Sequence, residues 1–263
     1  MTEQVEKKSE YALITGASSG LGEIFARELA AHGWPLILVA RRAARLRALA
    51  EALENAYGVH VHTVPADLTV DGGVDLVMDE VAKIGAHVGT LVNNAGAALH
   101  GRFAEMSLPD QMQMMRLNME PTVELTYRLL PAMRAVGHGG ILNVASMAAF
   151  QAGPMMTVYY ATKAFVLSFS EGLHEEVRKD GIHVTCLCPG PTETELVDLA
   201  GIRESRLVKY MGRRPEPVVW AGLRALERNK AVVIPGALNH FIITSLRFAP
   251  PGLPRNVAKF LHA

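Results

Sequence analysis

The order in which apolar runs and helical patterns follow one another constrains the fold of this chain more than any other feature. A short apolar run at residues 11–15 leads through a glycine-rich turn into a helical pattern at residues 21–31, and the same cycle then repeats. Runs such as residues 36–39 are apolar throughout, which is typical of parallel strands covered by helices. The alternation predicts an α/β fold, a doubly wound parallel sheet with helices on both faces.

The expected elements follow one another regularly up to Pro189, beyond which proline and glycine become frequent. Strands are predicted at residues 11–15, 35–40, 59–65, 90–93, 140–145, 182–187 and 231–234. Helices are predicted at residues 21–31, 43–57, 72–84, 112–136, 158–179 and 217–229. Because no linker or repeat interrupts this order, we expect residues 11–263 to form a single domain behind a flexible tail at residues 1–10.

Charge and hydrophobicity exclude several classes of partner. Twenty-six basic residues balance 26 acidic ones, so no overall field attracts nucleic acid or an anionic membrane. A transmembrane segment of about 18 uncharged apolar residues is not present, and residues 1–10 lack the apolar core of a secretory signal. We therefore expect a cytoplasmic protein that acts on a small molecule. Cys186 and Cys188 are expected to be buried, inert thiols, which permits a reducing compartment.

A glycine-rich turn follows the first predicted strand and opens the first predicted helix. It reads Thr-Gly-Ala-Ser-Ser-Gly-Leu-Gly over residues 15–22. Unpaired N–H groups and the helix dipole at such a helix start favour a phosphate group. A tight connection without a ligand would need the same glycines, but the flanking strand and helix favour a dinucleotide site. The candidate phosphate contacts are Gly16, Ser18, Ser19, Gly20, Leu21 and Gly22.

Two arginines follow the second predicted strand, where sites for NAD commonly carry an acidic residue. That place holds Ala40 here, and Arg41 and Arg42 come directly after it. A guanidinium pairs with a 2′-phosphate that a carboxylate would repel, so this pattern favours NADP over NAD. The same arginines would also suit an ordinary solvated helix face. Asp67 and Leu68 end the third predicted strand and could meet the adenine, although Asp67 could equally cap a helix.

A tyrosine and a lysine, Tyr159 and Lys163, stand four residues apart on a predicted helix, so their side chains share one face. A nearby ammonium favours the phenolate of a tyrosine, whose ordinary pKa is about 10. Such a pair can transfer protons at neutral pH. Surface packing explains the same spacing in many proteins, so the pair is a weak signal by itself. Tyr160 does not fit the spacing and is expected to pack.

Several motifs in a fixed order make the chain resemble the short-chain dehydrogenase/reductase family over residues 11–194. In chain order they are the glycine-rich turn, Asn93-Asn94-Ala95-Gly96 after the fourth predicted strand, Ser146 after the fifth, and the pair Tyr159 and Lys163. Asn118 matches the asparagine of the family's proton relay. The resemblance implies a Rossmann-type fold, a nicotinamide cofactor, and a homodimer or homotetramer built partly from the two longest helices.

The resemblance also implies a role for each polar residue of the candidate site. Tyr159 would give a proton to the substrate oxygen while nicotinamide gives hydride to carbon, and Ser146 would hold that oxygen. Lys163 would bind the nicotinamide ribose and lower the pKa of Tyr159, and Asn118 would support a water that links Lys163 to solvent. Residues 189–194 look like the family's segment beside the nicotinamide. Further implied cofactor contacts are Asn94, Ala95, Gly96, Tyr159, Lys163, Pro189, Gly190, Thr192 and Thr194.

The substrate is less closely defined. Gln151, Met155 and Met156 lie where the family varies and suggest an adaptable apolar wall, although methionines fill ordinary cores equally well. By analogy with the family, residues 194–214 would cover the substrate as a lid. The apolar residues 237–248 would suit the substrate pocket, a neighbouring subunit or lipid. A steroid, an acyl thioester, a sugar and an aromatic ketone all remain open.

The sequence therefore predicts an NADP(H)-dependent oxidoreductase, either a carbonyl reductase or an alcohol dehydrogenase. It would transfer a hydride between nicotinamide and an apolar carbonyl or secondary alcohol, with Tyr159 as general acid and base. No metal site is expected. The alternative is a catalytically silent NADP-binding regulatory protein, which fold-level analogy alone supports. Such a protein could lose Tyr159, Lys163 or Ser146, and this chain carries all three.

Overall fold

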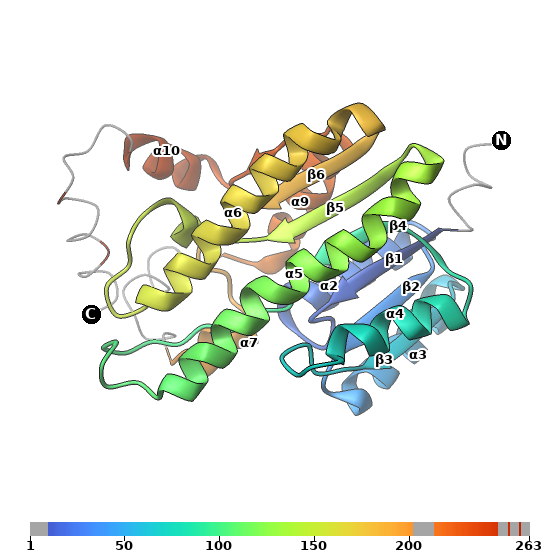
Figure 1. Cartoon of the computed structure of the whole chain (residues 1–263), viewed down its shortest axis with the longest axis horizontal. Helices are drawn as coiled ribbons and strands as arrows, with labels where there is room; N and C mark the ends of the chain where they lie inside the picture. Colours follow the sequence, from blue (N-terminus) through green and yellow to red (C-terminus); the bar gives the residue numbers. More distant parts are fainter. Residues whose placement is uncertain (1–9, 202–212, 247–251, 253–257, 259–263) are drawn as a thin grey trace.

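A parallel sheet lies at the centre of the molecule (Figure 1). The structure is a computed structural model that describes residues 10–201 and 213–246, together with Gly252 and Ala258. Within these ranges seven strands form one sheet in the order β3-β2-β1-β4-β5-β6-β7, with parallel neighbours throughout. The strands are β1 (Glu10–Thr15), β2 (Leu36–Ala40), β3 (Val61–Pro65), β4 (His87–Asn93), β5 (Gly139–Val144), β6 (Ile182–Leu187) and β7 (Val232–Val233).

Helices cover both faces of this sheet, as the alternation in the sequence predicts. α4, α5 and α6 pack on the face turned to the viewer in Figure 1, and α2, α3 and α9 pack on the opposite face. The helices are α2 (Gly20–Ala31), α3 (Ala43–Tyr57), α4 (Gly73–Lys83), α5 (Leu108–Val136), α6 (Thr157–Val177), α7 (Glu195–Leu199), α9 (Pro215–Glu227) and α10 (Ala237–Leu246), with short 3₁₀ turns η1 (Met147–Phe150) and η2 (Arg178–Asp180).

Alternate residues of each central strand belong to opposite apolar layers. In β1, Ala12 and Ile14 pack with α2, α3 and α9, whereas Leu13 packs with α4, α5 and α6. All three side chains are fully buried. A strand with no face toward water must be apolar at every position, which explains why the strands read as continuous runs and not as alternating patterns. The predicted doubly wound sheet is thereby confirmed.

A short chain of polar side chains crosses the interior between β4, β5 and α6. Asn93 and Asn143 are register partners in neighbouring strands, and the Asn93 Nδ2 donates to the Asn143 Oδ1 at 2.9 Å. The Asn143 Nδ2 donates in turn to the Ser170 Oγ at 3.0 Å. All three residues are buried. Partners of this kind replace water for the buried amide N–H groups, whereas the buried Asn93 Oδ1 has no hydrogen-bond partner among the described residues.

Most predicted boundaries agree with the structure to within a few residues, and the largest difference is at α5. The helix begins at Leu108, four residues before its predicted start. The Ser107 Oγ accepts a hydrogen bond from the Asp110 N–H, and Pro109 occupies the first turn, where proline needs no N–H partner. A cap and a proline outside the apolar pattern therefore extend the helix.

Two segments were expected to be flexible, the tail at residues 1–10 and the lid at residues 194–214. Glu10 is the first residue of β1, so the prediction that it belongs to a flexible tail is wrong. Residues 1–9 and residues 202–212, which include most of the expected lid, lie outside the described residues. None of the described helices combines the length and apolar character needed to cross a bilayer.

The strand order also explains where a site can form. β1 lies between β2 and β4, and it is the point from which the chain builds the sheet outward in both directions. The loops that follow β1 and β4 therefore diverge and leave a crevice at the carboxyl edge of the sheet.

Cys186 and Cys188 are both buried on β6 and the residues just beyond it, with their Sγ atoms 3.7 Å apart.

Candidate active site

A pocket of about 480 Å³ opens at the carboxyl ends of the strands. Its walls come from the segments that follow β1, β2, β3, β4, β5 and β6, with α10 closing one side. The crevice at the reversal of strand order is the usual place for a nucleotide in an open parallel sheet.

Glycines shape the turn between β1 and α2. Gly16 and Gly20 have φ angles of 67° and 57°, in the left-handed region that side chains disfavour. A Cβ atom on Gly22 would lie 2.2 Å from the Gly16 carbonyl oxygen, so only glycine allows α2 to begin this close to the turn. Gly22 does not line the pocket, whereas Gly20 and Leu21 do. The start of α2 therefore stands at the pocket, where its free N–H groups suit a phosphate.

Thr15 joins the turn after β1 to the turn after β4. Its Oγ1 accepts hydrogen bonds from the N–H groups of Asn94 and Ala95 at 3.0 and 2.9 Å. The Asn94 Nδ2 donates back to the Thr15 carbonyl oxygen at 2.9 Å. Asn94, Ala95 and Gly96 all line the pocket. The two walls of the crevice are thus fixed relative to each other by hydrogen bonds at its floor.

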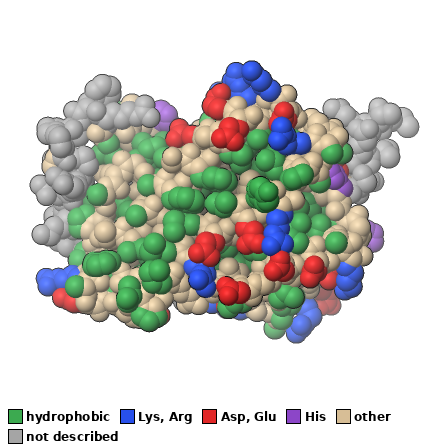
Figure 2. Space-filling model, viewed as in Figure 1, with side chains coloured by type: hydrophobic (Ala, Val, Ile, Leu, Met, Phe, Trp, Pro, Cys, Tyr) green, Lys and Arg blue, Asp and Glu red, His purple; other side chains and the backbone are tan. Residues whose placement is uncertain are grey.

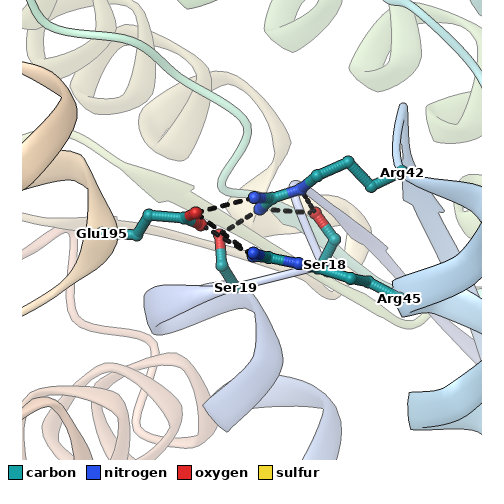
Figure 3. A network of polar contacts seen from close by, with 5 residues as sticks. All are labelled: Ser18, Ser19, Arg42, Arg45 and Glu195. Atoms are coloured by element: carbon teal, nitrogen blue, oxygen red, sulfur yellow. Dashed lines mark hydrogen bonds and ion pairs between the residues drawn. The ribbon is translucent and has the colours of Figure 1, made fainter.

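Arg42 lies over the glycine turn and is held there by hydroxyl and carboxylate groups (Figure 3). Its Nε and Nη2 donate to the Ser18 Oγ at 3.1 and 3.0 Å, and its Nη2 donates to the Ser19 Oγ at 2.7 Å. Its Nη1 donates to the Glu195 Oε1 at 2.8 Å, and Arg45 also contacts both oxygens of Glu195. The hydrogen bond from Arg42 is the main reason that the pKa of Glu195 falls to about 2. Glu195 is a carboxylate at neutral pH.

Asp67 closes a turn after β3. Burial raises the pKa of Asp67. Hydrogen bonds from Thr69 and the charge of Arg41 lower it by more, so the net pKa lies below its usual value. The Thr69 N–H and Oγ1 donate to Asp67 at 2.9 and 2.7 Å, and the Arg41 guanidinium lies 3.9 Å away. Asp67 caps no helix, because α4 begins beyond Gly72. Both Asp67 and Leu68 line the pocket, as do Arg41 and Arg42.

Tyr159 reaches the pocket from the first turn of α6. The side chain is only 9% exposed, and burial raises the pKa of its phenol, an effect that a hydrogen bond with Ser146 partly offsets. Burial is the largest influence, so the net pKa lies above its ordinary value, and the expected lowering by Lys163 stays a prediction. A phenol with a raised pKa keeps its proton at neutral pH, which is the state a proton donor needs.

Lys163 lies one turn further along α6 and is also buried. Its Nζ donates to the Val144 carbonyl oxygen at 2.9 Å and lies 5.8 Å from the centre of the Tyr159 ring. Burial lowers the pKa of Lys163 to about 8, while the thiols of Cys186 and Cys188 act in the opposite direction. The ammonium is therefore much easier to deprotonate than an ordinary lysine.

Asn118 lies behind the pocket wall and does not line the pocket. It is buried, and its Nδ2 donates to the Ala97 carbonyl oxygen and to the Thr162 Oγ1, each at 3.0 Å. Its Oδ1 accepts from the Ala97 N–H at 2.8 Å. Asn118 thus joins α5 to α6 and to the loop after β4, and its role in a water relay remains a prediction.

The end of the pocket beyond Tyr159 is apolar. Gln151 and Met156 line it, whereas Met155 does not; the Met155 carbonyl oxygen instead accepts the Gly101 N–H at 2.8 Å. α10 contributes three apolar residues to the same end, so the C-terminal apolar segment forms part of the pocket wall. These residues are Ile242, Ile243 and Leu246.

The structure brings most of the predicted site residues into one pocket. The predicted site residues that do not line the pocket are Gly22, Asn118 and Met155. Those that line it are Gly16, Ser18, Ser19, Gly20, Leu21, Arg41, Arg42, Asp67, Leu68, Asn94, Ala95, Gly96, Ser146, Gln151, Met156, Tyr159, Lys163, Pro189, Gly190, Thr192 and Thr194.

Some residues at the site were not predicted from the sequence. Apolar lining residues such as Val39 and Leu117 carry no motif, so only their position in the fold reveals them. Tyr160 was expected to pack; it does so against Gly153, and it also lines the pocket. Glu195 gave no signal, because its partners Arg42 and Arg45 stand about 150 positions earlier in the chain.

Comparisons with known proteins agree with this geometry. The family model for short chain dehydrogenases matches residues 10–204. Sulfoacetaldehyde reductase 2 of Chromohalobacter salexigens is 41% identical over 189 residues, which span 71% of this chain and 74% of the reductase.

Two of the solved structures that match cover most of this chain. A short-chain dehydrogenase from Sphingobium yanoikuyae in complex with NADPH has a TM-score of 0.83 and 35% identity, covering 93% of this chain and 95% of its own. An alcohol dehydrogenase from Comamonas testosteroni, described as specific for bulky-bulky ketones, has a TM-score of 0.77 and 30% identity, covering 93% of each chain. The likeness to both structures therefore covers most of the chain.

Proposed function

Because the chain belongs to the short-chain dehydrogenase family of oxidoreductases, we propose that it is an NADP(H)-dependent carbonyl reductase or secondary alcohol dehydrogenase. One observation carries the proposal. Tyr159, Ser146 and Lys163 meet in the same pocket as the glycine turn, at the edge of the sheet where a nicotinamide would lie. A bound nicotinamide supplies a hydride in reduction and accepts one in oxidation.

Residues of the chain supply the proton that the substrate oxygen takes up when the carbonyl is reduced. Ser146 orients the substrate oxygen beside the Tyr159 hydroxyl, and Tyr159 gives its proton to that oxygen as the carbonyl is reduced. The negative charge then left on the phenolate is stabilised by the Lys163 ammonium, which lies within 6 Å of the ring. In oxidation the same groups run in reverse, with the phenolate as base.

The preference for NADP over NAD is supported by the arginines near the adenosine end. Arg42 lies over the glycine turn with Ser18 and Ser19, which together offer cationic and hydroxyl donors to a 2′-phosphate. The second strand ends at Ala40, where a carboxylate would otherwise repel that phosphate. The Sphingobium neighbour, which is described in complex with NADPH, supports the same assignment.

An apolar substrate is supported by the wall beyond Tyr159. Among the described lining residues the cationic ones are Arg41, Arg42 and Lys163, and the arginines lie at the adenosine end. A sulfonate substrate such as that named for the Chromohalobacter relative would need a cationic partner, and among the described lining residues Lys163 is the cation near Tyr159. Methionine, leucine and isoleucine side chains suit a bulky ketone instead, which agrees with the substrate named for the Comamonas enzyme.

We also propose that residues 11–263 work as one domain, with residues 194–214 as the substrate lid. The lid assignment is supported by α7, at the start of that segment, because Leu196 and Val197 line the pocket. A cytoplasmic location remains a prediction from composition.

A panel of ketones, aldehydes and secondary alcohols tests the function directly. Absorbance of the reduced nicotinamide is followed with NADPH and with NADH, and the panel includes sulfoacetaldehyde as a charged member. We expect turnover of bulky apolar ketones, faster with NADPH than with NADH. Tight NADPH binding without turnover of any compound would favour the alternative, a catalytically silent regulatory protein. Faster turnover with NADH would contradict the cofactor assignment.

A further inference from the structure

Arg42 and Arg45 share one acidic partner at the rim of the pocket (Figure 3). The Glu195 Oε1 accepts hydrogen bonds from both guanidinium groups, at 2.8 Å from Arg42 and 3.2 Å from Arg45. The Glu195 Oε2 accepts a further hydrogen bond from Arg45 at 3.1 Å. A single carboxylate thus neutralises part of the cationic charge that faces the glycine turn.

The carboxylate comes from the opposite side of the pocket. Glu195 is the first residue of α7, which follows β6, while Arg42 and Arg45 lie at the start of α3 after β2. The two residues after it, Leu196 and Val197, line the pocket. Figure 3 shows Glu195 reaching from its own element toward Ser18, Ser19 and the two arginines. The contact therefore joins the proposed lid to the adenosine end of the site.

The same nitrogen atoms are those that a 2′-phosphate would use. Arg42 carries a planar fork of N–H donors, which binds a phosphate best through two of them. Its Nε and Nη2 are turned to the serine hydroxyl groups, and its Nη1 is turned to Glu195. A carboxylate and a phosphate a few ångströms apart repel each other in a partly dehydrated pocket. Binding of a phosphate must therefore displace Glu195 or tolerate its charge.

We propose that Glu195 is a specificity-determining residue that competes with the adenosine 2′-phosphate for Arg42 and so limits the preference of the chain for phosphorylated nucleotides. This inference rests on the proposed function, since it concerns the NADP site. An unphosphorylated ribose brings no second anion to Arg42, so Glu195 leaves its binding almost unchanged. Loss of the carboxylate therefore strengthens binding of the phosphorylated nucleotide selectively.

If the contacts of Glu195 instead help Arg42 to bind the phosphate, the change in affinity has the opposite sign. If Glu195 positioned Arg42 for the phosphate, its removal would weaken binding of the phosphorylated nucleotide. The direction of the change therefore decides between competition and positioning.

The test measures binding and needs no hydride transfer. Calorimetric titrations with adenosine 2′,5′-bisphosphate and with AMP compare the wild-type chain with Glu195→Gln. We expect the bisphosphate to bind about three- to tenfold more tightly to the variant, the scale of two partly exposed ion pairs, with AMP changed less than about twofold. Glu193→Gln is the matched control, because Glu193 is exposed and lies two residues earlier. Its affinities for both nucleotides should stay within about twofold of wild type.

Glu195→Ala provides a second variant, and circular dichroism checks that both fold. Unchanged or weaker bisphosphate binding in the folded variants would overturn the competition. An equal gain for bisphosphate and AMP would overturn it too, because a general loosening of the pocket causes such a gain. A wild-type chain that binds neither nucleotide would overturn the proposed cofactor site itself. A wild type that binds the bisphosphate, with an unchanged ratio in both variants, overturns the role of Glu195 alone.

Discussion

At the scale of single residues, the phenol of Tyr159 is the group on which the proposed chemistry depends. Its hydroxyl is buried, which raises its pKa, and it forms a hydrogen bond with Ser146. Tyr159→Phe keeps the ring and removes the proton donor, so turnover should fall by about 10²–10⁴-fold while NADPH affinity stays within a fewfold of wild type. Steady-state rates and a fluorescence titration of NADPH measure the two effects separately.

Tyr160→Phe is the matched control for this change. Tyr160 also lines the pocket and is the next residue along α6, so the control removes a hydroxyl from the same region. Its turnover should stay within about tenfold of wild type, below the range expected for a proton donor. Equal losses in the two variants would argue against Tyr159 as the proton donor.

Lys163 should make the fold less stable below its own pKa. Its pKa is lowered from 10.5 to about 8, so between these values the unfolded chain binds more protons than the folded chain, and stability rises with pH. Below pH 8 the full cost of burying the charge is present. Lys163→Met removes this cost but also the hydrogen bond to Val144, so we expect a gain of about 1–3 kcal/mol in the free energy of unfolding at pH 7.

Urea unfolding at pH 7 and pH 10.5 measures this gain, which should shrink at the higher pH. Lys179→Met is the control, because Lys179 is exposed and should show no dependence of this kind. A less stable Lys163→Met protein at pH 7 would mean that the hydrogen bond to Val144 outweighs the cost of burial.

At the scale of elements, two glycines in helices should respond to alanine in opposite ways. A Cβ atom on Gly22 in α2 would lie 2.2 Å from backbone, whereas one on Gly172 in α6 meets nothing within 4 Å. Gly22→Ala should lower stability by at least about 1 kcal/mol and weaken NADPH binding, because the turn must move. Gly172→Ala should raise stability by about 0.5–1 kcal/mol, because alanine restricts the unfolded chain and favours helix.

Thermal unfolding with and without NADPH measures both variants. A neutral Gly22→Ala protein with normal NADPH binding would show that α2 can withdraw from the turn at no cost.

Elements are also the scale at which the sequence predicted most. Continuous apolar strands and amphipathic helices report directly on burial, so the helix at residues 43–57 and the strand at residues 182–187 have the same bounds in the structure. The site motifs were equally accessible, because three of them directly follow strands of the sheet and the fourth, Tyr159 and Lys163, has helical spacing on α6. The raised pKa of Tyr159 was not accessible, since it depends on how deeply the folded chain buries the phenol. The pairing of Glu195 with Arg42 depends on loops brought together only by the fold.

At the scale of the whole molecule, an exposed apolar face on α5 and α6 supports the predicted homo-oligomer. Tyr127 is 79% exposed, Val123 and Phe165 are also exposed, and Phe165 stacks on Phe169. Figure 2 shows hydrophobic side chains gathered on the face that these helices occupy. Monomers seldom expose such contiguous apolar surface to water. We propose that two copies of the chain pair through this face.

Light scattering tests this pairing with a matched set of variants. We expect the wild-type chain to have at least twice the mass of one chain, and Tyr127→Glu combined with Phe165→Glu to shift it toward monomer. Tyr57→Glu is the control, because Tyr57 is exposed on α3 at the other face of the sheet. A monomeric wild type would contradict the oligomer, and a double variant that keeps the wild-type mass would place the interface elsewhere.

The amides of Asn93 and Asn143 have a consequence for how accurately the two halves of the pocket are aligned. They form a lock between β4 and β5, and these strands lead directly into the loops that carry Asn94 and Ser146. A slip of one residue between the strands would turn the two amides away from each other. Each amide would then be buried among apolar side chains without this hydrogen bond and without water to replace it. Apolar side chains would tolerate such a misalignment far better. The buried amides therefore fix the register of β4 and β5, and with it the distance between the loops that carry Asn94 and Ser146.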